Sequence, residues 1–479
     1  MGLLDRLKKK ESSNGSRGRR VMVIGLDCAP PEHIFDEYVD DIPNLSKLRA
    51  NGMWGPLQSI TPPITVPAWM CMMTSKDPGT LGIYGFRNRK DHTYEGLSIA
   101  TSWAIKEPTV WDILSQEGKD SIIMSVPPSY PPKPLKGIQI GCFLTPSSDA
   151  DYTYPPELKS ELEPKIGEYI FDIRNFRTDN TQYIIDEAYR MTEARFKAAN
   201  YLLGNKPWDF FMMVEMGPDR LNHGIWSFID PAHPRHQTGN QYRDALRDYY
   251  RYLDGQIGEL LDSHAGDDVT VIVVSDHGAK AMVGGVCFNE WLVREGYLTF
   301  KDELPADVTP INKLNIDWSQ TKAWGDGGYY GRLFLNVEGR EPDGVVPQSD
   351  YESLRDELIK KIESMVDHEG KSMGNRALKP EDTYVAQNGV PPDLIVIFGE
   401  LRWRSVGSLG HGSVYTFSND TGPDEANHAE NGIFIMNNAP GTQPGEKSGL
   451  HLWDVHNTIL DLFGLEPAVG ALGTSALRK

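Results

Sequence analysis

The chain has 479 residues, of which 48 are basic and 67 acidic, giving a formal net charge of −19. Hydrophobic residues make up 39% and charged residues 24%, a balance that excludes a chain disordered throughout. The acidic excess repels nucleic-acid backbones at long range, so we expect no nucleic-acid polymer as a partner. It also disfavours a phosphate-bearing ligand unless bound cations reverse the sign locally.

The four cysteines, Cys28, Cys71, Cys142 and Cys287, lie far apart in the sequence and form no C-x-x-C pair. This spacing argues against a disulfide framework and favours a reducing compartment, so we predict a cytoplasmic location. No apolar run reaches the roughly 18 residues that a transmembrane helix requires.

Residues 1–19 form a basic, Ser- and Gly-containing segment that we predict to be a disordered tail. Its first turns are weakly amphipathic, so weak docking to an anionic membrane or to a partner is the alternative. Order is expected to begin at Arg20.

Three short apolar runs end in Gly or in polar side chains: residues 21–27, 209–217 and 268–278. Each is too short for a buried helix and is rich in β-branched or aromatic residues, as is typical of buried parallel strands. Strands that are apolar on both faces imply helices on both sides of a sheet.

Two amphipathic segments supply such helices. One covers residues 187–203, and the other starts at Tyr242 and carries apolar residues at spacings of three and four. Each precedes an apolar run, and this helix-then-strand order predicts a doubly wound α/β sheet. Near the C-terminus, residues 431–437 indicate another strand, followed by a closing helix that Gly464 ends.

The alternating pattern breaks between about residues 287 and 390, where Pro and Gly are frequent. We predict that this stretch is an insertion forming a cap or side lobe within a catalytic domain of residues 20–479. It contains one helix, for which Ser349 and Glu352 suggest a capping box. The region 127–172 is expected to be loop-rich. Aromatic and polar residues of the cap that are candidates for specificity are Trp324, Tyr329, Tyr330 and Arg332.

Metal-competent side chains follow the predicted strands. Open α/β sheets bind ligands at the carboxyl ends of their strands, and divalent ions take carboxylate and imidazole ligands. A lone D-x-x-x-H is typical of a solvated helix face, so the argument depends on the joint appearance of these residues at strand ends. His428 precedes a strand and is expected to approach from a loop. The candidate metal ligands are Asp27, Asp219, His223, Asp276, His277 and His428.

Thr65 lies in the segment 61–75 and precedes Pro67, a residue suited to the first turn of a helix. A hydroxyl at a helix start lies in the field of the N-terminal amides, which also bind phosphate. A bound metal ion lowers the pKa of such a hydroxyl enough to make it a nucleophile. The alternative is a helix-capping threonine without chemistry.

The motifs GLD, T-x-x-x-T-x-P, D-x-x-x-H, D-H-G and N-H-x-x-x-G-I-F occur in this order between Val21 and about Leu472. Together they resemble the alkaline phosphatase superfamily, in particular its type I phosphodiesterase/nucleotide pyrophosphatase branch. The resemblance implies a mostly parallel central sheet and two divalent metal ions, usually zinc and sometimes manganese. It implies that one ion is held by Asp27, Thr65, Asp276 and His277, and the other by Asp219, His223 and His428.

The sequence departs from the family pattern after the nucleophile helix. Leu81 stands where members often have His in P-x-x-H-G-I, and Phe86 stands near the position of a phosphate-holding Asn. Arg87 and Asn88, just beyond, are therefore our candidates for substrate binding. Trp69 occupies the position of the sulfatase Arg, which argues against a sulfatase.

We therefore predict a phosphodiesterase or nucleotide pyrophosphatase acting on a small phosphate ester. Thr65 would attack phosphorus to form a phosphothreonine, which water then hydrolyses. A phosphomonoesterase or a mutase-type phosphotransferase on the same fold, and a hydrolase of lipid- or sugar-linked phosphates, remain alternatives. A catalytically silent binding protein is the alternative from another class. The oligomeric state is left open.

Overall fold

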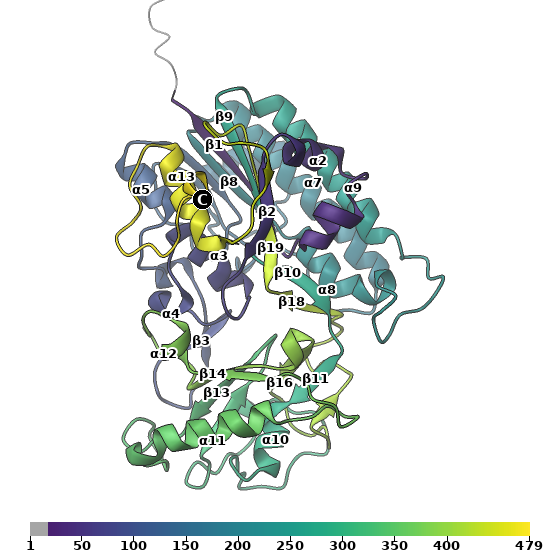
Figure 1. The fold of residues 1–479 in the computed structure, drawn as a ribbon, viewed down its shortest axis with the longest axis vertical. Coiled ribbons are helices and arrows are strands. Elements are labelled where there is room, and N and C mark those ends of the chain that lie inside the picture. Colours follow the sequence, from purple (N-terminus) through teal and green to yellow (C-terminus); the bar gives the residue numbers. More distant parts are fainter. Residues whose placement is uncertain (1–17) are drawn as a thin grey trace, which may run out of the picture.

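The computed structural model describes residues 18–479, so the predicted tail lies almost entirely outside the described residues. The chain forms a larger lobe built around one sheet and a smaller lobe beside it (Figure 1). Among residues 18–479, no helix combines the length and apolar character needed to cross a membrane.

The central sheet has ten strands in the order β20-β2-β19-β9-β1-β8-β5-β6-β7, with β21 pairing with β2. Its middle five strands, from β9 to β6, run parallel, whereas β19 and β7 are antiparallel to their neighbours. The strands are β1 (Arg20–Leu26), β2 (Met53–Gln58), β5 (Ser121–Met124), β6 (Gly137–Ile140), β7 (Thr153–Tyr154), β8 (Phe210–Glu215), β9 (Val269–Val274), β19 (Asn431–Asn437), β20 (Gly445–Glu446) and β21 (Leu450–His451).

The three predicted apolar runs are confirmed as β1, β8 and β9, which lie side by side. β1 pairs in parallel with β8 on one edge, Val21 opposite Phe210, and with β9 on the other, Arg20 opposite Val269. All residues of β8 and β9 are buried. Because the three strands are parallel and adjacent, their carboxyl ends meet at one edge of the sheet.

Helices cover both faces of the sheet, as predicted (Figure 1). On one side α7 packs against α8 and α9, and α2 packs on α9; on the other side α13 packs against α3 and α5. These helices are α2 (Pro43–Ala50), α3 (Thr65–Thr74), α5 (Val110–Gln116), α7 (Thr181–Asn205), α8 (Gly217–Ile229), α9 (Ala245–His264) and α13 (Leu452–Leu462).

The region 127–172 is more ordered than the sequence predicted. It contains β6 and β7, which extend the central sheet, and the helix α6 (Leu158–Ile166). The strands have only four and two residues, and Pro164 lies inside the helix, so no periodic pattern is long enough to indicate these elements.

The smaller lobe has its own hydrophobic core, with buried members from Val286 to Val414. Its four-stranded antiparallel sheet has the order β12-β13-β15-β14, and a second sheet has the order β16-β11-β17. The elements are β11 (Gly284–Cys287), α10 (Phe288–Arg294), β12 (Ala323–Asp326), β13 (Gly331–Leu335), α11 (Tyr351–Glu363), β14 (Arg376–Leu378), α12 (Pro380–Thr383), β15 (Leu394–Ile397), β16 (Trp403–Val406) and β17 (Tyr415–Thr416). The boundaries 287–390 proposed for the cap stay a prediction.

The expected capping box at the start of α11 is wrong. Asp350 is the N-cap and makes no side-chain cap, while the Ser349 hydroxyl donates to the Asp350 carboxylate. The 3₁₀ turn Gln348–Asp350 precedes the helix and places Ser349 too early to cap it. Glu352 instead pairs with Arg355.

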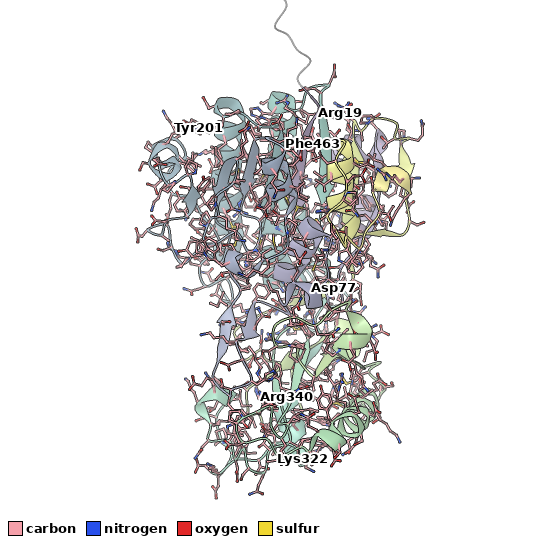
Figure 2. All side chains as sticks on the ribbon, turned by 90° about the vertical axis from the view of Figure 1, so that its left-hand side faces the viewer. Arg19, Asp77, Tyr201, Lys322, Arg340 and Phe463 are labelled. Carbon is pink, nitrogen blue, oxygen red and sulfur yellow. The ribbon has the colours of Figure 1, made fainter. Side chains whose placement is uncertain are left out.

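Polar contacts join the lobes at their boundary, near which Figure 2 shows Asp77. The Asp77 carboxylate accepts from the backbone amide of Thr80 in α4 (Pro78–Leu81), at 2.6 Å, and from that of Val385 in the smaller lobe, at 2.6 Å. These contacts hold the small lobe against the segment that follows the α3 helix.

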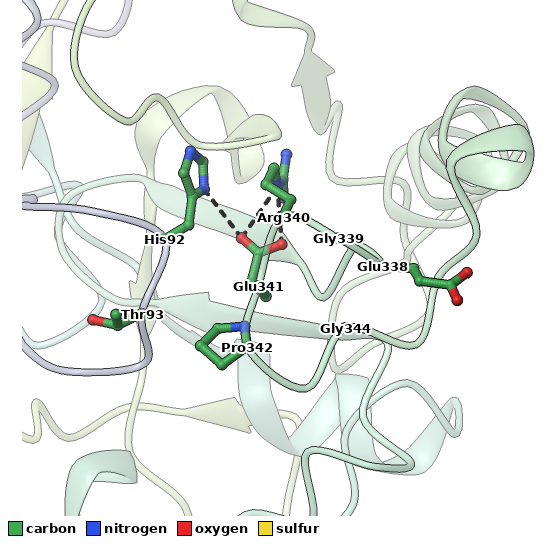
Figure 3. A pocket seen from close by; sticks show the side chains of 8 residues that line it. All are labelled: His92, Thr93, Glu338, Gly339, Arg340, Glu341, Pro342 and Gly344. Atoms are coloured by element: carbon green, nitrogen blue, oxygen red, sulfur yellow. Dashed lines mark hydrogen bonds and ion pairs between the residues drawn. The ribbon is translucent and has the colours of Figure 1, made fainter.

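A second contact centres on Glu341, whose side chain is completely buried. It lies 3.4 Å from Arg89, in the segment that follows α4. Figure 3 shows its contacts with His92, at 3.3 Å, and with Arg340, at 2.9 Å. A cavity of about 480 Å³ opens beside this cluster. Glu341 binds Val337 and Arg340 of its own lobe with one oxygen and Arg89 with the other, so the cluster joins the smaller lobe to the segment that contains β3 (Arg87–Arg89).

Gly25 in β1 leaves room for the Trp69 indole of α3. A Cβ at Gly25 would lie 2.5 Å from Trp69 Cη2 and 3.0 Å from the Met213 carbonyl oxygen. Trp69 can therefore lie flat over β1 and donate its Nε1–H to Asp27 Oδ2 at 2.7 Å.

We expect Gly25→Ala to lower the free energy of unfolding by about 1–3 kcal/mol, because the indole cannot move away from fully packed surroundings. Urea unfolding measures the change. Gly255→Ala is the matched control: a Cβ there meets nothing within 4 Å on the exposed face of α9, so stability should stay equal or rise. Equal stability of the Gly25→Ala protein and the parent would contradict this account of the packing.

Candidate metal centre

The predicted metal ligands come together at the carboxyl edge of the sheet. Their ligand atoms form overlapping groups, within each of which all atoms lie no more than 4.8 Å apart. The groups are Asp27, Asp276 and His277; Asp219, His277 and His428; and Cys28, Asp219 and His223.

The first group joins the ends of β1 and β9. Asp27 directly follows β1, and Asp276 and His277 follow β9 before β10 (Gly278–Ala281) begins. His277 Nε2 lies 3.1 Å from Asp276 Oδ2 and 3.9 Å from Asp27 Oδ1. The turn after β9 thus brings two sequence neighbours to the same point, which a regular strand would not do.

The other two groups share Asp219, and we call their members Asp219, His223 and His428 the second group; it starts on α8, directly after β8. Asp219 and His223 share one face of this helix, with Asp219 Oδ1 3.3 Å from His223 Nε2. His428 Nε2 lies 3.3 Å from His223 Nε2, and the His428 ring stacks on His277 with centroids 3.8 Å apart. His277 therefore connects the two groups.

His428 lies on a strand, and the expectation that it approaches from a loop is wrong. It belongs to β18 (Ala426–Ala429), which pairs antiparallel with β10 so that His428 faces Ala279. This pairing places the His428 ring beside His277, two residues before Ala279. The short, mixed-composition sequence of β18 gives no strand signal.

Thr65 is the first residue of α3 and is 2% exposed. Its Oγ1 lies 3.1 Å from His277 Nε2. The preceding loop is fixed at two carbonyls: that of Pro63 is 3.0 Å from His428 Nδ1, and that of Thr61 accepts from the Tyr384 hydroxyl at 2.9 Å. The hydroxyl, the helix start and the ligand groups thus share one site.

Burial and like charges destabilise the ionised form of the two carboxyl groups in the first group, Asp27 and Asp276. Burial raises the pKa of Asp27 well above its ordinary value, and the negative charges of Asp276 and Asp219 raise it further. Burial also raises the pKa of Asp276. Among residues 18–479, no group donates a hydrogen bond to the buried Asp27 Oδ1, and Asp276 Oδ2 has His277 as its neighbour at 3.1 Å; buried oxygens of this kind fit cation ligands.

The histidines divide into two kinds. Burial opposes charge on His277 and His223, but Asp276 raises the pKa of His277 to about 9, and Asp424 and Asp219 raise that of His223 to about 9. Burial and the neighbouring His277 and His223 lower the pKa of His428 well below its ordinary value. Since a metal binds neutral imidazole, loading the site releases protons from the first two.

Three polar residues around the ligands were not recognised from the sequence. Trp69 holds Asp27, as described above, and Arg220 pairs with Asp219 and with Asp172, the latter at 2.6 Å. Asp424 accepts from His223 Nδ1 at 2.8 Å. Asp424 precedes His428 by four residues in DEANH, a spacing with no motif value on its own.

Arg87 and Asn88, the predicted substrate-binding pair, make no contact with the candidate metal ligands among the hydrogen bonds and ion pairs of the described residues. Asn88 bonds within its own loop, accepting from the Tyr84 amide at 2.7 Å and donating to the Gly85 carbonyl at 3.0 Å. Arg87 is exposed at the start of the short strand β3 (Arg87–Arg89), which pairs with β4 (Leu97–Ile99). Their contact with substrate stays a prediction.

A doubly wound sheet with acid and imidazole ligands at its carboxyl edge defines the class of metal-dependent α/β hydrolases. The sequence model of the family described as type I phosphodiesterase/nucleotide pyrophosphatase matches residues 21–424. The chain belongs to this family, and its enzyme class is hydrolysis of phosphodiester or pyrophosphate bonds. No curated protein matches the chain.

We expect divalent cations to stabilise the protein. After treatment with a chelator, adding Zn²⁺ or Mn²⁺ should raise the unfolding temperature, because an ion at 100 times its dissociation constant adds about 2.7 kcal/mol. Asp276→Asn should reduce this gain, since it removes a ligand oxygen from the first group.

The control is Asp302→Asn, which removes an exposed carboxylate in the smaller lobe and should retain the full gain. Differential scanning calorimetry at a series of metal concentrations measures both variants. An identical gain in the Asp276→Asn and Asp302→Asn proteins would show that the first group holds no ion.

Proposed function

We propose that the protein is a phosphodiesterase of the nucleotide pyrophosphatase type, with Thr65 as the nucleophile and two divalent ions as cofactors. The observation that carries the proposal is the position of Thr65 Oγ1, 3.1 Å from Nε2 of His277, which belongs to two of the ligand groups. A threonine that only capped the helix would not need to contact a candidate metal ligand, whereas a nucleophile for phosphoryl transfer would.

The two ions would be held by different elements. Asp27, Thr65, Asp276 and His277 would hold one, and Asp219, His223 and His428 the other. When bound, the ions would lower the pKa of the Thr65 hydroxyl and offset the charge of the phosphoryl oxygens. The mixed carboxylate and imidazole set suits zinc, with manganese as the alternative.

The chain's own residues set the course of the reaction. Thr65 Oγ, having lost its proton to solvent, forms a bond to phosphorus while the bond to the leaving oxygen breaks, and the leaving group takes a proton from water. Water then attacks the phosphothreonine and restores the Thr65 hydroxyl. The amides at the start of α3 would favour the negative charge of a phosphate bound beside Thr65.

The charges around the site favour a diester over a monoester. A monoester carries an additional negative charge, which needs a free cationic side chain. Arg220 is engaged by Asp172 and Asp219, and Arg177 is engaged by Asp424 at 2.9 Å. The charge of each guanidinium is already compensated by a carboxylate, which disfavours the monoesterase and mutase-type alternatives. The intact ligand set disfavours a silent binding protein.

A cavity of about 500 Å³ is connected to the second ligand group through Arg220 and Asp424, and we propose it as the place of the leaving group. Two of its lining residues are Asp172 and Arg177. Asp172 accepts from Arg220, which pairs with Asp219, and Arg177 donates to Asp424, which accepts from His223. Two of its lining residues, Thr145 and Arg177, each have a buried polar atom, Oγ1 and Nε, with no hydrogen-bond partner among residues 18–479. These polar groups would receive the hydroxyls of a small alcohol. The cytoplasmic location stays a prediction.

Thr65→Ala should lower turnover of bis(p-nitrophenyl) phosphate about a thousandfold or more, because the nucleophile is lost while the Asp and His ligands remain. Stopped-time absorbance assays and metal analysis of the same samples measure the two effects. Thr80→Ala, on the following short helix, is the control and should keep both properties. Parent-like turnover in the Thr65→Ala enzyme would exclude Thr65 as the nucleophile.

Thr145→Val should lower kcat/KM for a glycerol-containing phosphodiester by about fivefold, the equivalent of one hydrogen bond, with little effect on the p-nitrophenyl diester. Thr153→Val in β7 is the control, since the Thr153 hydroxyl already donates to the Pro155 carbonyl at 3.0 Å. If the two substrates respond alike to Thr145→Val, the cavity does not hold the leaving group.

A further inference from the structure

A hairpin turn of the smaller lobe reaches the metal centre. Residues 327–330 connect β12 to β13, and Tyr330 packs into the core of the larger lobe. A Cβ on Gly327 would lie 2.6 Å from the Gly407 amide nitrogen, so only glycine lets the turn pack so closely on the chain leaving β16. The turn is therefore held where the two lobes meet.

The Tyr329 side chain lies against two of the ligands. Its ring centroid is 4.9 Å from that of His223, with the rings stacked, and 4.3 Å from that of His428. Asn427, next to His428 in β18, donates to the Tyr329 carbonyl at 3.0 Å and fixes its backbone. Tyr329 thus covers the imidazoles of the second group from the smaller lobe.

The Tyr329 hydroxyl contacts a buried carboxylate. It donates to Asp424 Oδ2 at 3.2 Å and accepts from Arg177 Nη2 at 2.7 Å, while Arg177 also donates to Asp424 Oδ2 at 2.9 Å. The other oxygen, Asp424 Oδ1, accepts from His223 Nδ1 at 2.8 Å. Asp424 is 2% exposed, so its charge depends on these partners.

This arrangement sets the tautomer of His223. With Nδ1 donating to Asp424, Nε2 faces Asp219 Oδ1 at 3.3 Å and His428 Nε2 at 3.3 Å. A carboxylate behind a ligating imidazole fixes the ring and raises its basicity, and losing such a partner typically costs 10- to 100-fold in metal affinity. Whatever holds Asp424 therefore acts on the second metal group.

We propose that Tyr329 is a positioning residue through which the smaller lobe sets the metal affinity of Asp219, His223 and His428. The inference rests on the proposed function, since it requires an ion at this group. Tyr329 orients Asp424 with its hydroxyl and restrains His223 and His428 with its ring. A displacement of the smaller lobe would act first on this group, because Tyr329 contacts two of its members directly.

The test compares Tyr329→Phe with Tyr330→Phe in the full-length protein. Both keep the ring, and the Tyr330 hydroxyl donates to the Tyr84 carbonyl, away from the ligands. Zn²⁺ is titrated into chelator-treated protein in competition with a chromophoric chelator. We expect Tyr329→Phe to weaken one of two sites roughly tenfold and Tyr330→Phe to stay within about twofold of the parent.

Asp424→Asn provides an independent measurement. It should weaken the same site, and adding Tyr329→Phe to it should cost less than Tyr329→Phe costs alone, because the hydroxyl acts through Asp424. The turnover lost in the Tyr329→Phe enzyme should return at high Zn²⁺ concentration. Circular dichroism of all variants shows whether each is folded.

Parent-like affinity at both sites of the Tyr329→Phe protein overturns the inference. So does an equal loss in the Tyr330→Phe protein, because the effect would then come from lobe docking and not from the hydroxyl at Asp424. If the parent binds no stoichiometric metal, the proposed function fails as well. If the parent binds two ions and Thr65→Ala is inactive, the proposed function stands, and the Tyr329→Phe result then tests the role of Tyr329 alone.

Discussion

The structure depends on one electrostatic constraint, the burial of three carboxylates, Asp27, Asp219 and Asp276, whose negative charges act on one another. Parallel β1, β8 and β9 impose this arrangement, because their carboxyl ends open at the same edge of the sheet. The surroundings offset part of the repulsion. Burial alone would raise the pKa of Asp219, but His223 and Arg220 lower it below its ordinary value. Asp27 and Asp276 have no such cationic partner beyond His277, which is why this side of the site requires a cation most.

The smaller lobe is inserted where the metal centre is formed. The chain leaves the larger lobe through β10, directly after His277, and returns through β18, which carries His428. These two strands pair, so the beginning and the end of the insertion meet between two ligands. The same return path supplies Asp424, and the turn with Tyr329 contacts it. The lobe is thus part of the site's support, and its position and the geometry of the second ligand group are coupled through named hydrogen bonds.

Sequence reasoning recovered what local chemistry determines and missed what only tertiary contacts determine. β1, β8 and β9 were predictable because strands buried on both faces are continuously apolar, and the pairing of Asp219 with His223 followed from helix geometry. The strand of His428 and the helix and strands within residues 127–172 were missed, because very short strands and proline-containing helices carry too weak a pattern. The capping box of α11 was wrongly predicted, because the preceding 3₁₀ turn makes Asp350 the N-cap. Asp424 and Trp69 gain their roles only when distant segments pack, which no spacing reveals. The roles of Thr65, Arg87 and Asn88 stay predictions.

An acidic chain can bind a negatively charged phosphate ester only if bound cations offset the negative charge at the site. A protein of net charge −19 repels phosphate esters, yet its family acts on them. If two divalent cations bind as proposed, their charge exceeds that of the ligand carboxylates Asp27, Asp219 and Asp276, which would turn the centre of the site weakly positive within an acidic molecule. Such a field attracts a singly charged diester only at short range and leaves polyanions repelled at long range. The same excess of acid outside the site raises the local concentration of divalent cations. Cation capture and selection of a small substrate therefore follow from one charge distribution.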